Sequence, residues 1–194
     1  MIVWPAHRQT PHHVCPAPRR NYSAPVVAEA VSAVSLLLLA ASGVSKTLDP
    51  DPTTGAMRSA GLPASRATSW SLGIGEVAAA GAGIALGGAW VGGAGLLYLG
   101  FLLFTVAAVR RRLPIQSCGC FGREDTPPTM LHVGFNAVSA VALTVVALGS
   151  RHPVPWSGPA LEVVLYLLFA ILGAHLAYLV MAQLPRTLHP TGTR

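Results

Sequence analysis

Two cysteines lie one residue apart in a short polar stretch, Ser117-Cys118-Gly119-Cys120-Phe121-Gly122. Two thiols at this spacing can form a disulfide, bind a metal together, or exchange electrons with a partner. A disulfide between Cys118 and Cys120 would close a small, strained ring, and strained exposed disulfides tend to be labile or catalytic. Gly119 has no Cβ, so the backbone can bend sharply between the thiols. The predicted chemistry is thiol–disulfide exchange, with Cys118 and Cys120 as the catalytic residues.

The charges around this pair favour reactive thiols. The triplet Arg110-Arg111-Arg112 precedes the pair and Arg123 follows it, and nearby positive charge stabilises a thiolate. A structural zinc site needs four ligands. The sequence supplies only the two cysteines here, with His132 as a distant third, so no metal is predicted. Inert cysteines at a tight turn are the alternative interpretation.

Three further polar residues accompany the pair as supporting candidates. Glu76 lies inside an apolar stretch, where a central charge costs about 2.5–3.5 kcal/mol on insertion scales, so it is expected to have a partner. Lys46, at the end of the preceding apolar stretch, is the expected partner. Such a pair either fixes helix packing or forms a polar cluster that relays protons or steadies a cofactor. His132, which shares a helix face with Asn136, is a candidate proton acceptor for a thiol.

Long apolar runs must position these residues. The chain of 194 residues is 52% hydrophobic and only 10% charged, against about 25% charged in average soluble domains. Since a membrane span needs about 20 apolar residues, spans are predicted near 26–48, 70–87, 91–109, 130–148 and 160–184, with the glycine pairs 87–88 and 92–93 marking a turn. The predicted fold is an all-α polytopic membrane protein, a bundle of about five transmembrane helices built as a four-helix core plus one.

The predicted organisation has three parts. Residues 1–25 form a disordered polar tail, in which Cys15 and three histidines are a weaker alternative metal site. Residues 26–150 form the four-helix membrane core with the cysteine loop at 110–129, and a short interfacial helix is expected at 57–62. Residues 151–194 contain the fifth helix and a short basic tail.

The basic residues indicate an orientation rather than a nucleic-acid site. The net charge is +6, but the basic residues are divided among connecting segments without interleaved aromatics, so no nucleic-acid partner is predicted. Four Lys and Arg residues fall on the side of the N-terminus and nine on the side of the cysteine loop. The positive-inside rule therefore places that loop in the cytoplasm, although disulfides persist mainly in oxidising compartments.

Four sequence features occur in an order that resembles a known family. They are Ser42-Gly43-Val44-Ser45-Lys46, then Asp49-Pro50, then Glu76, then Cys118-Gly119-Cys120-Phe121-Gly122. Over about residues 28–150 the chain resembles the MauE branch of the DoxX-like membrane proteins (methylamine utilisation protein MauE). The fifth span and the polar N-terminal tail depart from the four-helix pattern of that family.

The resemblance implies a multi-pass protein of the bacterial plasma membrane that acts in thiol–disulfide chemistry beside a thioredoxin-like partner. In the methylamine branch it implies help in maturing a disulfide-rich dehydrogenase subunit. Lys46, Asp49, Glu76, Cys118 and Cys120 occupy the matching positions.

The predicted function is membrane-embedded thiol–disulfide exchange, with electrons passing to or from a thioredoxin-fold partner or a quinone in the bilayer. The alternatives are a non-enzymatic membrane anchor for a redox complex, and a small-solute transporter that uses Lys46 and Glu76. Replacing the cysteines by serine, or Glu76 by glutamine, separates these classes.

Overall fold

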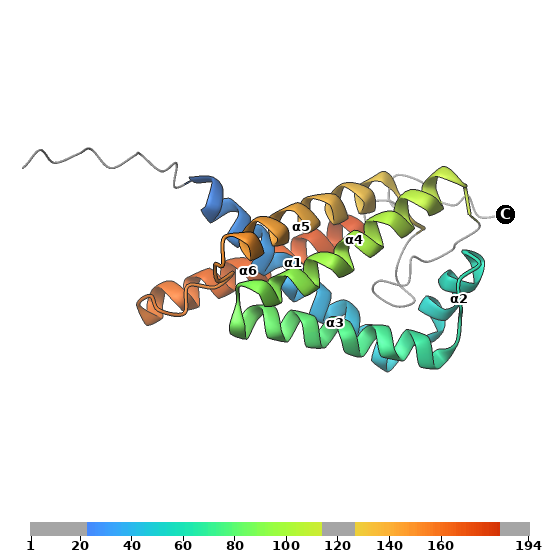
Figure 1. Cartoon of the computed structure of the whole chain (residues 1–194), viewed down its shortest axis with the longest axis horizontal. Coiled ribbons are helices and arrows are strands. Elements are labelled where there is room, and N and C mark those ends of the chain that lie inside the picture. Colours follow the sequence, from blue (N-terminus) through green and yellow to red (C-terminus); the bar gives the residue numbers. More distant parts are fainter. Residues whose placement is uncertain (1–22, 114–126, 183–194) are drawn as a thin grey trace, which may run out of the picture.

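The fold is a bundle of long helices, seen in a computed structural model that describes residues 23–113 and 127–182 (Figure 1). The described residues contain six helices: α1 (Ser23–Leu48), α2 (Asp51–Ser59), α3 (Arg66–Leu86), α4 (Ala89–Arg110), α5 (Met130–Leu148) and α6 (Ala160–Ala182). Cys15, Cys118, Cys120 and Arg123 lie outside the described residues, as do the N-terminal tail to residue 22 and the basic tail from residue 183.

The five predicted membrane spans are confirmed. All helices except α2 are long and apolar enough to cross a bilayer, so the chain is an all-α, multi-pass membrane protein. Of the two predicted glycine pairs, only Gly87-Gly88 forms the turn between α3 and α4, since both residues have positive φ angles of 64° and 52°. The pair at 92–93 lies inside α4, because glycine also accepts ordinary helical angles.

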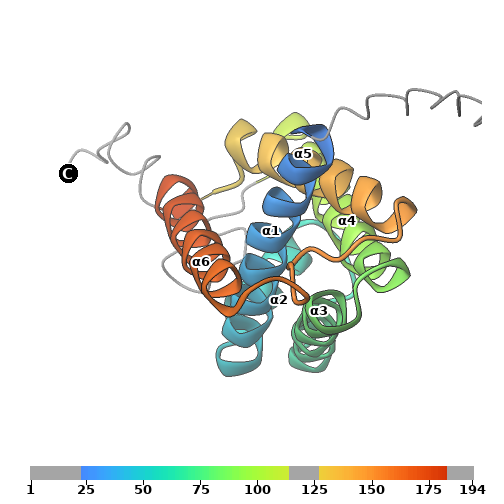
Figure 2. The same ribbon diagram turned by 90° about the vertical axis from the view of Figure 1, so that its left-hand side faces the viewer.

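The core forms where α1, α3, α4 and α5 meet. α1 packs against α3, α5 and α6, while α4 packs against α3 and α5, and Figure 2 shows α1 between α6 and the other long helices. The central buried side chains come from all four core helices, and include Leu36, Ala80, Val91 and Leu143. These apolar contacts hold the helices that carry the polar site residues.

The short helix α2 lies between the ends of α1 and α3 and differs from the sequence prediction. It begins at Asp51 and ends at Ser59, earlier than the predicted 57–62, with Pro52 in its first turn. Proline suits that position, because the first helical N–H groups have no partner within the helix. Thr54 Oγ1 of α2 lies 2.8 Å from Ser69 Oγ of α3, which ties α2 to the bundle.

The fifth span, α6, lies against the core rather than within it. It packs mainly on α1, through Ala174 and Met181. Most of its other large side chains are exposed, including Leu168, Phe169 and Leu172. An almost entirely apolar, exposed surface is the expected state of a helix in contact with lipid.

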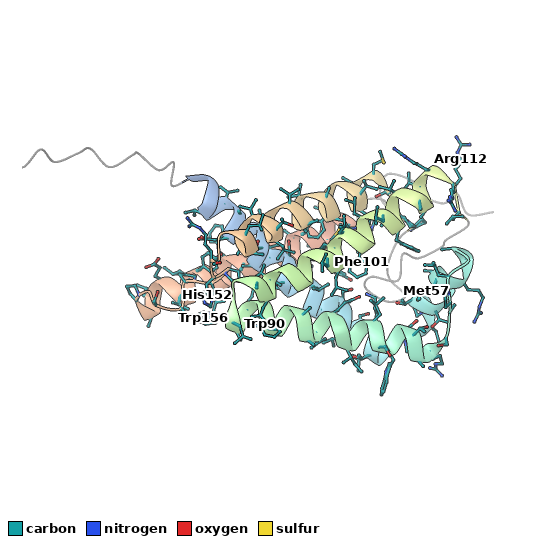
Figure 3. All side chains as sticks on the ribbon, viewed as in Figure 1. Met57, Trp90, Phe101, Arg112, His152 and Trp156 are labelled. Atoms are coloured by element: carbon teal, nitrogen blue, oxygen red, sulfur yellow. The ribbon has the colours of Figure 1, made fainter. Side chains whose placement is uncertain are left out.

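The two ends of the bundle carry different residues. Trp90, His152 and Trp156 lie at one end and Arg112 at the other (Figure 3). Tryptophan favours membrane interfaces, and arginine favours the aqueous side of a span. α2, the end of α4 and the start of α5 lie at the arginine end (Figure 1). The cysteine segment joins α4 to α5, so both of its described flanks are at this end.

Candidate functional site

The predicted pairing of Lys46 with Glu76 is confirmed. Lys46 Nζ of α1 lies 3.0 Å from Glu76 Oε2 of α3, and the two side chains are only 4% and 0% exposed. Glu76 is at the middle of α3, about 15 Å from either end at 1.5 Å per residue. A carboxylate at that depth needs a counter-charge, because transfer of an unpaired charge out of water is costly.

Two glycines allow the pair to form. A Cβ on Gly43 of α1 would lie 2.5 Å from the carbonyl oxygen of Gly73 on α3, and a Cβ on Gly73 would lie 2.7 Å from the carbonyl oxygen of Gly43. The two backbones therefore touch at this crossing, where any larger residue would push them apart. Gly43 is three residues before Lys46 and Gly73 is three before Glu76, so the contact sets the distance between the two charges.

Two further residues complete the surroundings of Lys46. Its ammonium group donates a hydrogen bond to Ser42 Oγ, one turn earlier on α1. It also lies 5.6 Å from the ring centroid of Phe101 on α4, a distance at which a cation is attracted to an aromatic face. Glu76 Oε1 is buried and has no hydrogen-bond partner among the described residues. The cluster therefore keeps one carboxylate oxygen as an unused acceptor.

His132 is buried at the start of α5, and is 2% exposed. The backbone N–H of Thr129 donates to its Nδ1 at 3.3 Å, and Thr129 Oγ1 lies 3.0 Å from the same nitrogen. Accepting at Nδ1 leaves Nε2 to carry the proton of the neutral ring. Asn136, one turn later, is also buried, and its Nδ2 donates to Thr105 Oγ1 of α4 at 3.4 Å.

A small cavity lies beside His132. It has a volume of about 30 Å³, and its lining includes Ser42, His132 and Asn136. Most of its other lining residues are apolar, among them Leu39 and Phe135. Ser42 also accepts the hydrogen bond from Lys46, so it borders both this cavity and the ion pair.

The remaining predicted residues lie around this cluster. Asp49 follows the end of α1, and its Oδ1 accepts a hydrogen bond from the backbone N–H of Asp51 at 3.4 Å. Arg110, Arg111 and Arg112 are exposed at the end of α4. Cys118 and Cys120 follow in the segment outside the described residues.

A larger cavity opens beside the ion pair. It has a volume of about 270 Å³, with Lys46 on its wall among side chains of α2, α3 and α4. Phe101 on α4 and Met57 on α2, both labelled in Figure 3, are among its lining residues. Residues 23–113 and 127–182 contain no group of three or more His, Cys, Asp or Glu side chains that could hold a metal ion.

The fold and this cluster define a class: a multi-pass helical membrane protein with a buried lysine–glutamate pair between α1 and α3. The family model described as methylamine utilisation protein MauE matches residues 24–149, and the chain belongs to this family. Searches of curated proteins and of solved structures gave no match. Membership of this family makes the chain a membrane protein of a group involved in methylamine utilisation.

Sequence reasoning missed two parts of the site. Ser42 stands four residues before Lys46, the helical spacing at which side chains meet, so its role had a local signal. Phe101 had none, because it comes from another helix and is one of many apolar residues in α4. Only the packing of α4 against the core brings its ring near Lys46.

Proposed function

We propose that this protein is a thiol–disulfide redox protein of the bacterial plasma membrane, in which Cys118 and Cys120 cycle between dithiol and disulfide. It exchanges electrons with a thioredoxin-fold partner. Through that partner it aids disulfide formation in an exported protein, as in the maturation of a disulfide-rich dehydrogenase subunit.

One structural observation supports the proposal above the others. The buried polar cluster of Lys46, Glu76, Ser42 and His132 extends from the middle of α3, at Glu76, toward the end of the bundle from which the cysteine segment extends. His132 and Ser42 line the same small cavity, and a purely structural ion pair does not require a buried histidine. A thiol exchange centre does need groups that accept and return protons, since the attacking species is the thiolate.

The proposed chemistry assigns a role to each group. A thiolate of the reduced partner attacks the Cys118–Cys120 disulfide, forming a mixed disulfide and releasing a thiolate of the pair. The partner's second thiolate then attacks the mixed disulfide, which leaves the partner oxidised and Cys118 and Cys120 as a dithiol. Two electrons and two protons move from the partner's thiols to the pair. His132 accepts a proton when the pair is later re-oxidised, and the arginine triplet after α4 stabilises the thiolate.

Trapping of a mixed disulfide tests the proposal. Cys118→Ser and Cys120→Ser each remove one thiol, so the remaining cysteine cannot be released by its neighbour. We expect one of the two variants to accumulate a covalent, reductant-sensitive complex with a thioredoxin-fold protein in membranes. Cys15→Ser is the matched control, because it removes a cysteine outside the pair and should leave trapping unchanged.

The same variants identify the competing function. If neither single variant gives a mixed disulfide and the double serine variant supports normal maturation of the exported partner, the protein is an anchor or scaffold and the redox proposal is wrong.

A further inference from the structure

The cavity beside Lys46 has the properties of a ligand site. Its volume of about 270 Å³ is close to the lower limit of about 300 Å³ for small-molecule pockets. Its walls are mostly apolar, with Leu72 from α3, Leu97, Phe101 and Phe104 from α4, and Met57 from α2. A cavity of this size accommodates one ring system rather than a whole lipid.

The cavity is reached from the bilayer. Leu96 and Gly100 belong to its lining, and both are exposed on α4, with Leu96 71% exposed. α3 and α4 are two of the membrane spans. A molecule that enters between them arrives from the lipid phase, and a hydrophobic tail can extend back into it.

The charge of the site selects the kind of head group. An ammonium group has three N–H donors; that of Lys46 gives one to Ser42 and one to Glu76. Its charge is already balanced by the Glu76 carboxylate. A second anion would leave a net negative charge in the span, which is costly, whereas a neutral carbonyl oxygen adds a hydrogen bond without adding charge.

We propose that this cavity, the Lys46 pocket, binds the head ring of a lipid-soluble quinone. One ring carbonyl accepts a hydrogen bond from Lys46 Nζ, and the ring packs against Phe101 and Phe104. The site thereby supplies an electron acceptor for the thiols, a role that rests on the function proposed above. The binding itself is independent of the thiols.

The redox step balances. The two S–H bonds of Cys118 and Cys120 break and one S–S bond forms, releasing two electrons and two protons. The quinone takes both electrons and both protons, so its two carbonyl oxygens become the hydroxyl groups of a quinol. Lys46 can donate a proton to the reduced oxygen. A proton released by the thiols can then restore Lys46 by way of Glu76, whose Oε1 has no hydrogen-bond partner among the described residues and can accept it.

The experiment measures binding of decylubiquinone to the full chain in detergent by equilibrium dialysis. The protein carries Cys118→Ser and Cys120→Ser, so no thiol exchange contributes. Gly100→Leu adds a side chain at the pocket, whereas Gly93→Leu adds the same side chain two turns earlier on the same face of α4, away from it. Neither added Cβ meets another atom within 4 Å, so both variants are expected to fold.

We expect saturable binding that Gly100→Leu weakens by about 5- to 150-fold, the factor equivalent to a steric cost of about 1–3 kcal/mol. Gly93→Leu should bind like the parent. The proposal would be overturned by an absence of saturable binding or by an equal loss of affinity in the two variants. It would also be overturned if an equal concentration of oleate displaced the quinone. Quinone binding without any mixed disulfide refutes the thiol function alone, and a mixed disulfide without quinone binding refutes the pocket alone.

Discussion

The Lys46→Met substitution tests whether the buried pair is held in its charged form. It removes the ammonium group and leaves the Glu76 carboxylate at the middle of α3 without a counter-charge. Breaking a buried ion pair on one side typically costs about 3–5 kcal/mol. Glu76 has no route to water, since its side chain is fully buried, so we expect a loss of unfolding free energy of about this size.

Two further variants separate charge from packing. Glu76→Met leaves Lys46 unpaired, but Lys46 is two residues from the end of α1 and a long lysine can reach toward the interface. The Glu76→Met variant should therefore lose less unfolding free energy than the Lys46→Met variant. The double variant replaces both charges by apolar groups of similar size, a change that is often neutral or stabilising. It should recover most of the stability that Lys46→Met loses.

The measurement is reversible unfolding in mixed micelles, followed by helical circular dichroism. Arg66→Ala is the control, because Arg66 forms an exposed ion pair with Asp51 at 3.2 Å; exposed pairs contribute about 0–1 kcal/mol. A Lys46→Met protein as stable as wild type, or a double variant no more stable than Lys46→Met, would refute the electrostatic reasoning.

Two other predictions rest on single contacts, and a third concerns the side of the membrane that the cysteine pair faces. Gly43→Ala should destabilise the bundle by about 1–3 kcal/mol, because the new Cβ would lie 2.5 Å from a carbonyl oxygen of α3; Gly75→Ala, with open space around it, should lose nothing in the same unfolding assay. Tyr98→Phe removes a 2.7 Å hydrogen bond from the buried hydroxyl to a carbonyl of α1, and should cost about 1 kcal/mol in that assay. Exchange with the partner of an exported protein requires the cysteine pair to face outward, so an impermeant maleimide should label Cys118 or Cys120 in intact cells, against the orientation that the positive charges predict; labelling only after the membrane is opened would support the charge-based orientation and contradict the proposed function.

The spans were predictable because the bilayer imposes one requirement on every crossing segment. Each crossing segment needs about 20 apolar residues whose backbone groups are hydrogen-bonded within the segment, and this gives a strong local signal. α5, for example, begins and ends where the sequence predicted. A short helix was predicted in the segment of α2, but its bounds were wrong, because a stretch with two Asp-Pro pairs resembles a linker, although proline also fits the first turn of a helix. The turn between α3 and α4 was located only in part, since glycines that reverse the chain and glycines that pack within a helix have the same local signal.

The sequence also predicted that Glu76 would need a partner and that Lys46, at the end of the preceding span, was the expected one. The predicted roles of Cys118, Cys120, Asp49 and His132 in catalysis stay predictions. A catalytic role depends on what a side chain contacts during the reaction, and the order of residues along the chain does not specify those contacts.

The sequence by itself therefore determined the class of this protein, its number of spans and the end of the bundle from which the thiols extend. These properties depend on hydrophobicity, length and order along the chain. Only the tertiary structure decided that Gly43 and Gly73 meet, that Phe101 faces Lys46, and that a cavity opens between α2, α3 and α4. Those contacts join residues on different helices, and they depend on how the helix surfaces fit together, which no local pattern of residues encodes.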